Sequence, residues 1–131
     1  MKVWQNKYIR ILKGTDMGIY AISDLHLAKS IEKPMDIFGN NWVSYMEKIE
    51  ENWLKTIGHD DFVIIPGDLS WATYLKDAFD DFSFMESLPG TKLILKGNHD
   101  YWWTTHKKIN EFCFENDFKS LVFLQNQSYI I

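Results

Sequence analysis

Three short clusters of polar residues hold the side chains of this 131-residue sequence that are best suited to chemistry. Each cluster follows directly on an apolar run that is typical of a buried strand. The clusters are Asp24-Leu25-His26 after residues 19–22, Gly67-Asp68 after 62–65, and Gly97-Asn98-His99-Asp100 after 93–95. A single polar strand end is an ordinary turn, whereas three of them indicate a site.

The first cluster places a carboxylate two residues before an imidazole. In an extended backbone, Asp24 and His26 point to the same side, so together they can bind one ion. The alternative is that Asp24 caps a loop and His26 is merely exposed. This spacing alone therefore leaves the role of the pair open.

The second cluster places a carboxylate directly after a glycine. Gly67 allows the backbone to turn tightly at the strand end. Asp68 can be read as a helix N-cap, but Ser70 is better placed to cap a helix that begins at Trp71. This arrangement leaves Asp68 free to bind an ion.

The third cluster combines an amide, an imidazole and a carboxylate. The amide oxygen of Asn98 can ligate a hard or borderline metal, and His99 can act as a general acid or as a donor to developing charge. Asp100 can hold the His99 ring in one tautomer. It can also cap a helix that begins at Tyr101, and the two roles are compatible.

With Asp100 set aside to hold the His99 ring, the clusters together offer two carboxylates, an amide and two imidazoles at three neighbouring strand ends. Imidazole ligands favour Mn²⁺, Fe or Zn²⁺ over Mg²⁺ alone. Two such ions, about 3.5–4 Å apart, can polarise a phosphoryl group, activate water and stabilise the attacking and leaving oxygens. The side chains therefore predict a two-metal site for phosphoester hydrolysis.

The elements that must position these clusters alternate between strand and helix. Apolar residues three or four apart predict helices over 40–57, from Trp71 to just before Pro89, and over 101–116. Two further apolar runs, 121–124 and 129–131, are predicted strands. Because each parallel crossover needs a helix, the order βαβαβ predicts an α/β fold with a largely parallel sheet. Ligands bind at the carboxyl ends of such strands, where all three clusters fall.

Composition and charge exclude several other classes of function. The net charge of −4, without a dense basic stripe, argues against a dedicated nucleic-acid surface. No apolar run approaches the length of about 18 residues that a membrane span needs. The single cysteine, Cys113, cannot form an internal disulfide and is expected to be a small buried hydrophobe. We therefore expect a cytoplasmic protein.

The three motifs, at these intervals and each after an apolar strand, resemble those of the calcineurin-like metallophosphoesterase family. The resemblance covers residues 18–131 and implies a β-sandwich flanked by helices. It implies that Asp24 and His26 bind a first divalent ion. It further implies that Asp68 bridges two ions and that Asn98 binds the second.

The resemblance also implies roles for the last two residues of the third cluster. His99 would contact the phosphate of a phosphoester substrate and assist the leaving group, and Asp100 would orient the His99 ring. The residues that follow the second and third clusters, 69–72 and 101–103, resemble a bacterial subgroup of predicted phosphohydrolases. The motifs do not specify whether the substrate is a monoester or a diester.

The sequence departs from the family after its third cluster. Family members continue with a further strand-end histidine and a Gly-His-x-His motif, and neither is present here. We therefore interpret 18–131 as the N-terminal half of the domain, incomplete at the C-terminus. The predicted strand 129–131 would then be an exposed edge, open to completion by another chain or to self-association.

Two other functions fit parts of the pattern. A non-catalytic remnant of the fold would bind a metal or a partner without turnover. A receiver-like switch module also has aspartates at strand ends and a lysine, here Lys96, near the third strand. We rank the receiver last because it gives no role to His26, Asn98 or His99.

Residues 1–17 have no clear period and are expected to form a leader or N-terminal extension, because Met17 stands immediately before the first strand. If translation naturally starts at Met17, deletion of residues 1–16 should leave folding intact. Thermal unfolding followed by circular dichroism checks this expectation. Loss of the cooperative transition in the shortened chain would contradict it.

Overall fold

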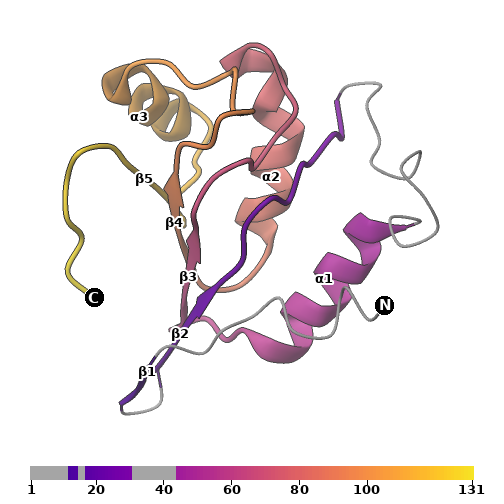
Figure 1. Cartoon of the computed structure of the whole chain (residues 1–131), viewed down its shortest axis with the longest axis vertical. Helices are drawn as coiled ribbons and strands as arrows, with labels where there is room; N and C mark the ends of the chain where they lie inside the picture. The colour runs from indigo at the N-terminus through magenta and orange to yellow at the C-terminus, as the bar shows by residue number, and fades with distance from the viewer. Residues whose placement is uncertain (1–11, 15–16, 31–43) are drawn as a thin grey trace.

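The computed structural model describes residues 12–14, 17–30 and 44–131, which form a sheet with helices packed against it (Figure 1). The strands are β1 (Leu12–Gly14), β2 (Met17–Ala21), β3 (Phe62–Ile65), β4 (Thr91–Leu95) and β5 (Leu121–Leu124). They lie side by side in the order of the sequence. Strands β2 to β5 are parallel to one another, and β1 pairs with β2 in the antiparallel direction. The predicted α/β fold with a largely parallel sheet is confirmed.

Strand β1 lies within the segment that the sequence analysis assigns to a leader. Its three residues pair with the outer edge of β2, from Leu12 opposite Ile19 to Gly14 opposite Met17. An edge strand presents unpaired backbone groups, and β1 satisfies them on this side. These three residues therefore belong to the sheet.

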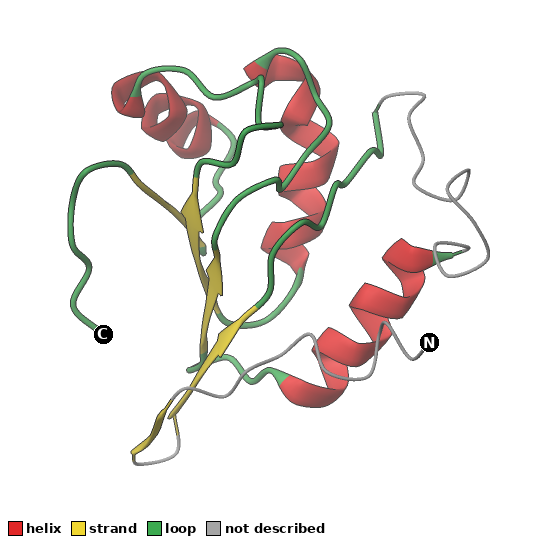
Figure 2. Cartoon of the chain, in the orientation of Figure 1, coloured by secondary structure: helices red, strands yellow, loops and turns green. Residues whose placement is uncertain are grey.

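The helices are α1 (Tyr45–Thr56), η3 (Leu75–Ala78), α2 (Phe79–Ser87) and α3 (His106–Glu115), where η3 is a single 3₁₀ turn. Figure 2 shows these helices beside the strands. The predicted helix over 40–57 corresponds to α1, although residues 40–43 lie outside the described part of the chain.

The second helix begins later in the chain than the predicted start at Trp71. Residues 71–74 are not helical, and Ser70 pairs with Leu27 in an isolated parallel bridge instead of capping a helix. The backbone N–H of Trp71 donates to the carbonyl of Leu27 at 2.9 Å. Because this bridge holds the chain extended, the regular helix α2 starts only at Phe79.

The third predicted helix also begins later than expected. Its N-cap is Thr105, whose side chain accepts a hydrogen bond from the Lys108 N–H. Residues 100–103 form a turn, in which the Trp103 N–H donates to the Asp100 carbonyl at 3.1 Å. Asp100 is therefore not the cap of α3, because its carboxylate binds other backbone groups that are described below.

The two faces of the sheet differ in burial. On the face covered by the helices, the register aligns residues that are fully or nearly fully buried, namely Val63, Ile65, Lys92, Ile94, Leu121 and Phe123. Phe82 of α2 packs on Phe123 with ring centroids 5.2 Å apart. On the opposite face Leu93 is also buried, whereas Ile64, Val122 and Leu124 are only half-buried. No second sheet covers this face within the described residues.

The C-terminal residues do not form the predicted strand. Residues 125–131 contain no strand, and Ile130 is 94% exposed. The Tyr129 ring packs against Phe62 at 6.1 Å between centroids. The C-terminal end of the chain lies on the side of the sheet away from α1 and α2 (Figure 1). The sheet edge that was expected at residues 129–131 is therefore wrong. In the described residues the strand at this edge is β5.

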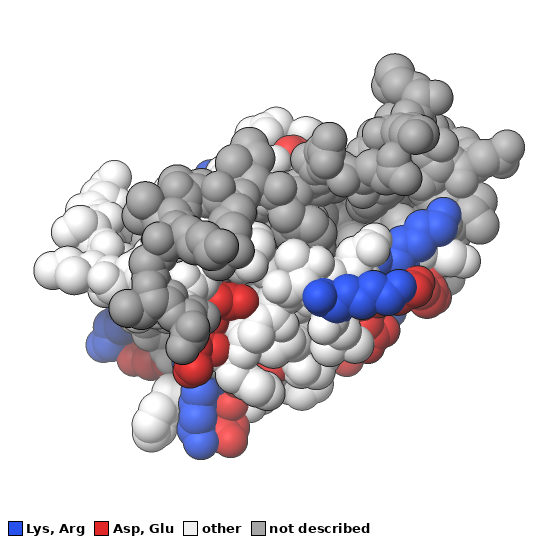
Figure 3. Space-filling view, turned by 90° about the horizontal axis from the view of Figure 1, so that it is seen from below, with Lys and Arg blue, Asp and Glu red and all other residues white. Residues whose placement is uncertain are grey.

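Surface charges are interspersed on the face seen in Figure 3, where basic side chains lie beside acidic ones. Described ion pairs of this kind are Lys55 with Glu51, Lys107 with Glu111 and Lys119 with Asp117. None of the helices in the described ranges has the length and apolar character that a membrane crossing requires.

One buried lysine lies in the core. The Nζ of Lys92 donates to the carbonyl of Leu88 and, at 2.9 Å, to the Oγ of Ser120. Glu86 accepts a 2.7 Å hydrogen bond from the same Ser120 hydroxyl. Burial lowers the pKa of Lys92 to about 8, although the charge of Glu86 opposes the shift. Below that pKa the fold must therefore bury a charged ammonium group.

This burial predicts a pH dependence of stability. Between pH 8 and the ordinary lysine pKa of 10.5, the unfolded chain binds more protons at Lys92 than the folded chain, so stability rises with pH. The free energy of unfolding should increase by about 1 kcal/mol between pH 8 and 9 relative to Lys92→Met. Urea denaturation at the two pH values measures this difference. The same change in the free energy of unfolding between pH 8 and 9 in the wild type and in Lys92→Met would contradict the burial of a charged Lys92.

The upper limit of this pH window is set by Cys113. Burial raises the pKa of its thiol to about 11 from the ordinary value of 9. Above pH 9 the unfolded chain loses the thiol proton first, which lowers stability and opposes the effect of Lys92. The comparison is therefore made below pH 9.

Candidate metal centre

The loops that leave β2, β3 and β4 run side by side at one end of the sheet (Figure 2). The first loop pairs with the second beyond the end of the strands. The N–H groups of Asp24, His26 and Leu27 donate to the carbonyls of Gly67, Asp68 and Leu69 at 3.2, 2.9 and 2.9 Å. This pairing brings the first two polar clusters together.

The backbone in these loops is left-handed, not extended as the sequence analysis assumed. Asp24, His26 and Asp68 have φ angles of 57°, 46° and 54°. Residues with side chains adopt this conformation uncommonly, at a cost of order 1–3 kcal/mol each. Three such residues in one cluster are therefore held in place by the surrounding contacts.

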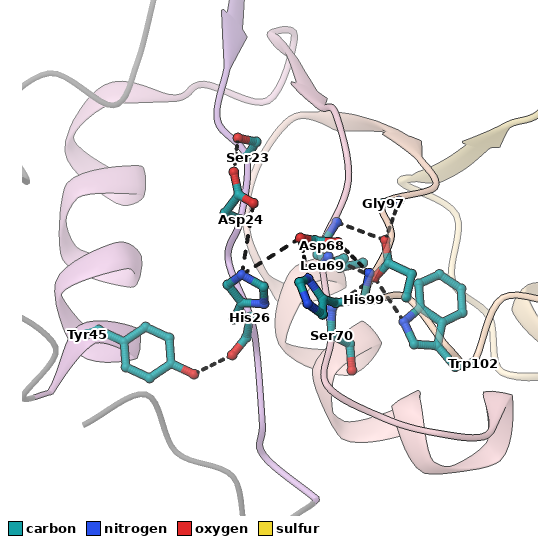
Figure 4. Close-up of polar contacts among 11 residues, drawn as sticks. Ser23, Asp24, His26, Tyr45, Asp68, Leu69, Ser70, Gly97, His99 and Trp102 are labelled. Carbon is teal, nitrogen blue, oxygen red and sulfur yellow. Dashed lines mark hydrogen bonds and ion pairs between the residues drawn. The ribbon is translucent and has the colours of Figure 1, made fainter. Parts of the chain in front are cut away.

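The side chains of the three loops converge on Asp68 (Figure 4). The Oδ2 of Asp68 lies 3.0 Å from the Nδ1 of His99 and 3.9 Å from the Nε2 of His26. The same His26 nitrogen lies 3.9 Å from the Oδ1 of Asp24. His26, Asp68 and His99 each offer one ligand atom, and these three atoms all lie within 4.8 Å of one another.

This geometry fits metal ligation. Two donors that each lie about 2.1 Å from one ion can be no more than about 4.2 Å apart, and the 3.9 Å separations at His26 satisfy this limit. The Nε2 of His26 is the nitrogen that faces these carboxylates, and the Nδ1 of the same ring is buried without a hydrogen-bond partner in the described part of the chain. Imidazole and carboxylate together suit Mn²⁺, Fe or Zn²⁺.

The protonation states of the cluster favour the same interpretation. Burial lowers the pKa of His26, although the carboxylates of Asp68 and Asp24 oppose the shift. Burial by itself would raise the pKa of Asp68. The hydrogen bonds from His99 outweigh it and lower that pKa. A neutral imidazole beside an ionised carboxylate is the state that binds metals.

An aromatic ring that the sequence analysis assigned to a helix contacts both histidines. Trp71 stacks on His26 with centroids 4.6 Å apart and an interplanar angle of 21°. It also lies 5.0 Å from the His99 ring. Its position three residues after Asp68 is the only sequence signal for this contact, whereas the expectation made Trp71 the first residue of a helix.

The carboxylate of Asp100 links the second and third loops through backbone hydrogen bonds. It accepts from the N–H groups of Asp68 at 2.8 Å, Leu69 at 2.9 Å, Ser70 at 3.3 Å and Gly97 at 2.8 Å, and from the Trp102 indole at 3.1 Å. The described contact of the His99 ring nitrogen is with Asp68 instead. The structure therefore gives Asp100 a different set of partners from the expected His99 ring.

Two glycines allow the second and third loops to approach closely. Gly67 has a φ of +131°, and a Cβ added there would lie 2.6 Å from the Gly97 Cα. A Cβ added at Gly97 would overlap the Asp68 carboxylate. The absence of side chains at both positions leaves room for Asp68 at the centre of the cluster.

The structure thus brings together four of the six predicted site residues. His26 and Asp68 are buried, His99 is partly buried, and the Asp24 side chain is 60% exposed. Asp100 is buried behind Asp68, and Asn98 is exposed in the loop that carries His99. Within the cluster, Asp24 is the side chain most exposed to solvent.

The sheet and this cluster define an α/β domain with a candidate metal site at its strand ends. The sequence profile of the calcineurin-like phosphoesterases matches residues 17–130. The chain therefore belongs to the calcineurin-like phosphoesterase family, which confirms the resemblance found in the three motifs.

A solved structure gives further support for the fold. The chain is similar to a protein of unknown function from Aquifex aeolicus, with 23% identity and a TM-score of 0.53. The match covers 82% of this chain and 52% of that structure, so the chain spans about half of its length. A comparison with curated proteins finds no match.

The contacts of Asp100 predict a stability defect. In Asp100→Asn, an amide N–H₂ replaces one of two oxygens that each accept at least two hydrogen bonds. The free energy of unfolding should fall by about 2–4 kcal/mol. His99→Ala should lower it by less than about 1 kcal/mol. Urea denaturation of the metal-free proteins measures both effects, and equal losses would contradict a linking role for Asp100.

Proposed function

We propose that this chain carries the metal-binding half of a phosphoester hydrolase with a dinuclear site for Mn²⁺, Fe or Zn²⁺. The main support is the convergence of His26, Asp68 and His99, with Asp24 beside them, at the carboxyl ends of three parallel strands. Membership of the calcineurin-like phosphoesterase family supports the same activity. Phosphatase and phosphodiesterase activities are both consistent with this site.

The proposed ligands divide between two ions. Asp24 and His26 would hold the first ion, since the Nε2 of His26 and the Oδ1 of Asp24 are 3.9 Å apart. Asp68 would contribute to holding both ions, because its carboxylate lies between the two histidines. Asn98 would hold the second ion, with its exposed side chain in the third loop. When bound, the ions would polarise the phosphoryl group and lower the pKa of water.

The remaining side chains act on the substrate or hold the site. The His99 ring is 37% exposed, so its free edge can donate to a phosphate oxygen or to the leaving group. The Asp100 carboxylate accepts from the backbone N–H of Asp68 and fixes its loop, and Asp68 in turn accepts from the backbone N–H of His99. Asp100 therefore influences His99 through Asp68. Asp100 is therefore proposed as a positioning residue for His99.

A covalent nucleophile is not part of this proposal. The Ser70 hydroxyl is buried and donates to Asp81. Cys113 is buried in α3, and its raised pKa keeps the thiol protonated near neutral pH. The attacking group is therefore proposed to be water. A single unpaired cysteine is also consistent with our proposal of a cytoplasmic location.

The alternative is a remnant that binds metal without turnover. It is favoured by the small donor set in the described residues, namely His26, Asp68 and His99 with Asp24 beside them. The chain spans about half the length of a solved structure with this fold. Hydrolysis would exclude the remnant.

Hydrolysis of nitrophenyl phosphate and of its bis ester tests the proposal. With Mn²⁺ present, the chain should release nitrophenol, and Asp68→Asn should abolish the release. His99→Ala should lower kcat by about 10²–10⁴. Asp80→Asn serves as the control, because Asp80 is an exposed carboxylate on α2 away from the cluster. Activity that survives both site substitutions would contradict the assigned site, and Mn²⁺ binding without hydrolysis would favour the remnant.

A further inference from the structure

A second buried carboxylate lies outside the three motifs. Asp81, in the first turn of α2, is 1% exposed and uses both of its oxygens. Its Oδ1 accepts from the backbone N–H of Lys29 at 2.8 Å, and its Oδ2 accepts from the Ser70 hydroxyl at 2.5 Å. Asp81 belongs to none of the three polar clusters.

The two donors belong to different loops of the metal centre. Lys29 comes three residues after His26, and Ser70 comes two residues after Asp68. Between these points the loops are joined by the bridge of Leu27 with Ser70. The loops after β2 and β3 pair through their backbones and so place His26 beside Asp68. Asp81 binds both loops at the end of this pairing, through Lys29 and Ser70.

The environment of Asp81 favours a positioning role over simple packing. Burial raises the pKa of its carboxyl, although the Ser70 hydroxyl and the Lys29 N–H oppose the shift. A buried carboxylate is unfavourable unless hydrogen bonds compensate it. Its neighbours on α2, Phe82 and Met85, pack in the apolar core. The hydrogen-bonded carboxylate fixes the two loops with a directionality that an apolar side chain cannot supply.

We propose that Asp81 is a positioning residue that sets the separation of His26 and Asp68 and thereby the affinity of the site for its first metal ion. The proposal rests on the proposed function. Asp81 acts between the loops after β2 and β3, whereas Asp100 acts between the loops after β3 and β4. Removal of Asp81 should therefore impair His26 and spare His99.

Calorimetric titration of the full chain with Mn²⁺ tests this proposal. Asp81→Asn should weaken Mn²⁺ binding about tenfold or more, because an amide cannot accept from both donors. Asp80→Asn is the matched control on the same helix and should leave binding unchanged. Ser70→Ala removes only one of the two hydrogen bonds to Asp81, and this second variant should weaken Mn²⁺ binding to a smaller extent.

Two measurements separate positioning from a general loss of stability. In the Asp81→Asn background, His26→Ala should cause little further loss of Mn²⁺ affinity, whereas Asn98→Ala, which removes the proposed ligand from the loop after β4, should keep its full effect. In metal-free protein, hydrogen exchange should show lost protection of the Lys29 amide in Asp81→Asn. Ile109→Ala destabilises the core at α3 and should change neither result.

The outcomes distinguish this proposal from the function on which it rests. If the wild-type chain binds no Mn²⁺, the proposed function and this inference both fail. If the wild-type chain binds Mn²⁺ and both Asp81→Asn and Ser70→Ala bind it equally well, this inference alone fails. Weaker binding in Asp81→Asn that is matched by Ile109→Ala would also overturn it.

Discussion

Backbone amides beyond the ends of β2, β3 and β4 need hydrogen-bond acceptors, and two buried carboxylates supply many of them. Asp100 accepts from four backbone N–H groups and from an indole, and it ties the loop after β3 to the loop after β4. Asp81 accepts from Lys29 and Ser70, and it ties the loop after β2 to the loop after β3. Charge-assisted hydrogen bonds of this kind are stronger than neutral ones. The positions of His26, Asp68 and His99 depend on these two connections.

The same constraint explains the local conformations of the site. The three left-handed residues, Asp24, His26 and Asp68, are unfavourable in isolation and persist because neighbouring loops fix them. Gly67 and Gly97 let two backbones meet where side chains would displace the Asp68 carboxylate. Trp71 then covers the His26 ring. The result is a concentrated group of donors held by a rigid surrounding structure, which is the arrangement that metal sites require.

The sequence predicted the parts of this structure that depend on local pattern. The apolar runs at Phe62–Ile65 and Leu121–Leu124 are strands β3 and β5, and the motifs identified the family. It failed where tertiary hydrogen bonds override local preference. Trp71 bonds to Leu27 in place of starting a helix, and the Asp100 carboxylate binds loop amides in place of capping α3. Asp81 was not recognised because nothing in its local sequence distinguishes it from the exposed Asp80.

The central claim is that three strand-end loops form one metal site around Asp68. A crystal structure of the chain grown with Mn²⁺, with anomalous difference maps recorded at the manganese edge, tests it most directly. The account predicts an anomalous peak within bonding distance of the Asp68 carboxylate and the His26 imidazole. Peaks found only at other positions, with Asp68 and His26 left without a metal ion, would contradict it.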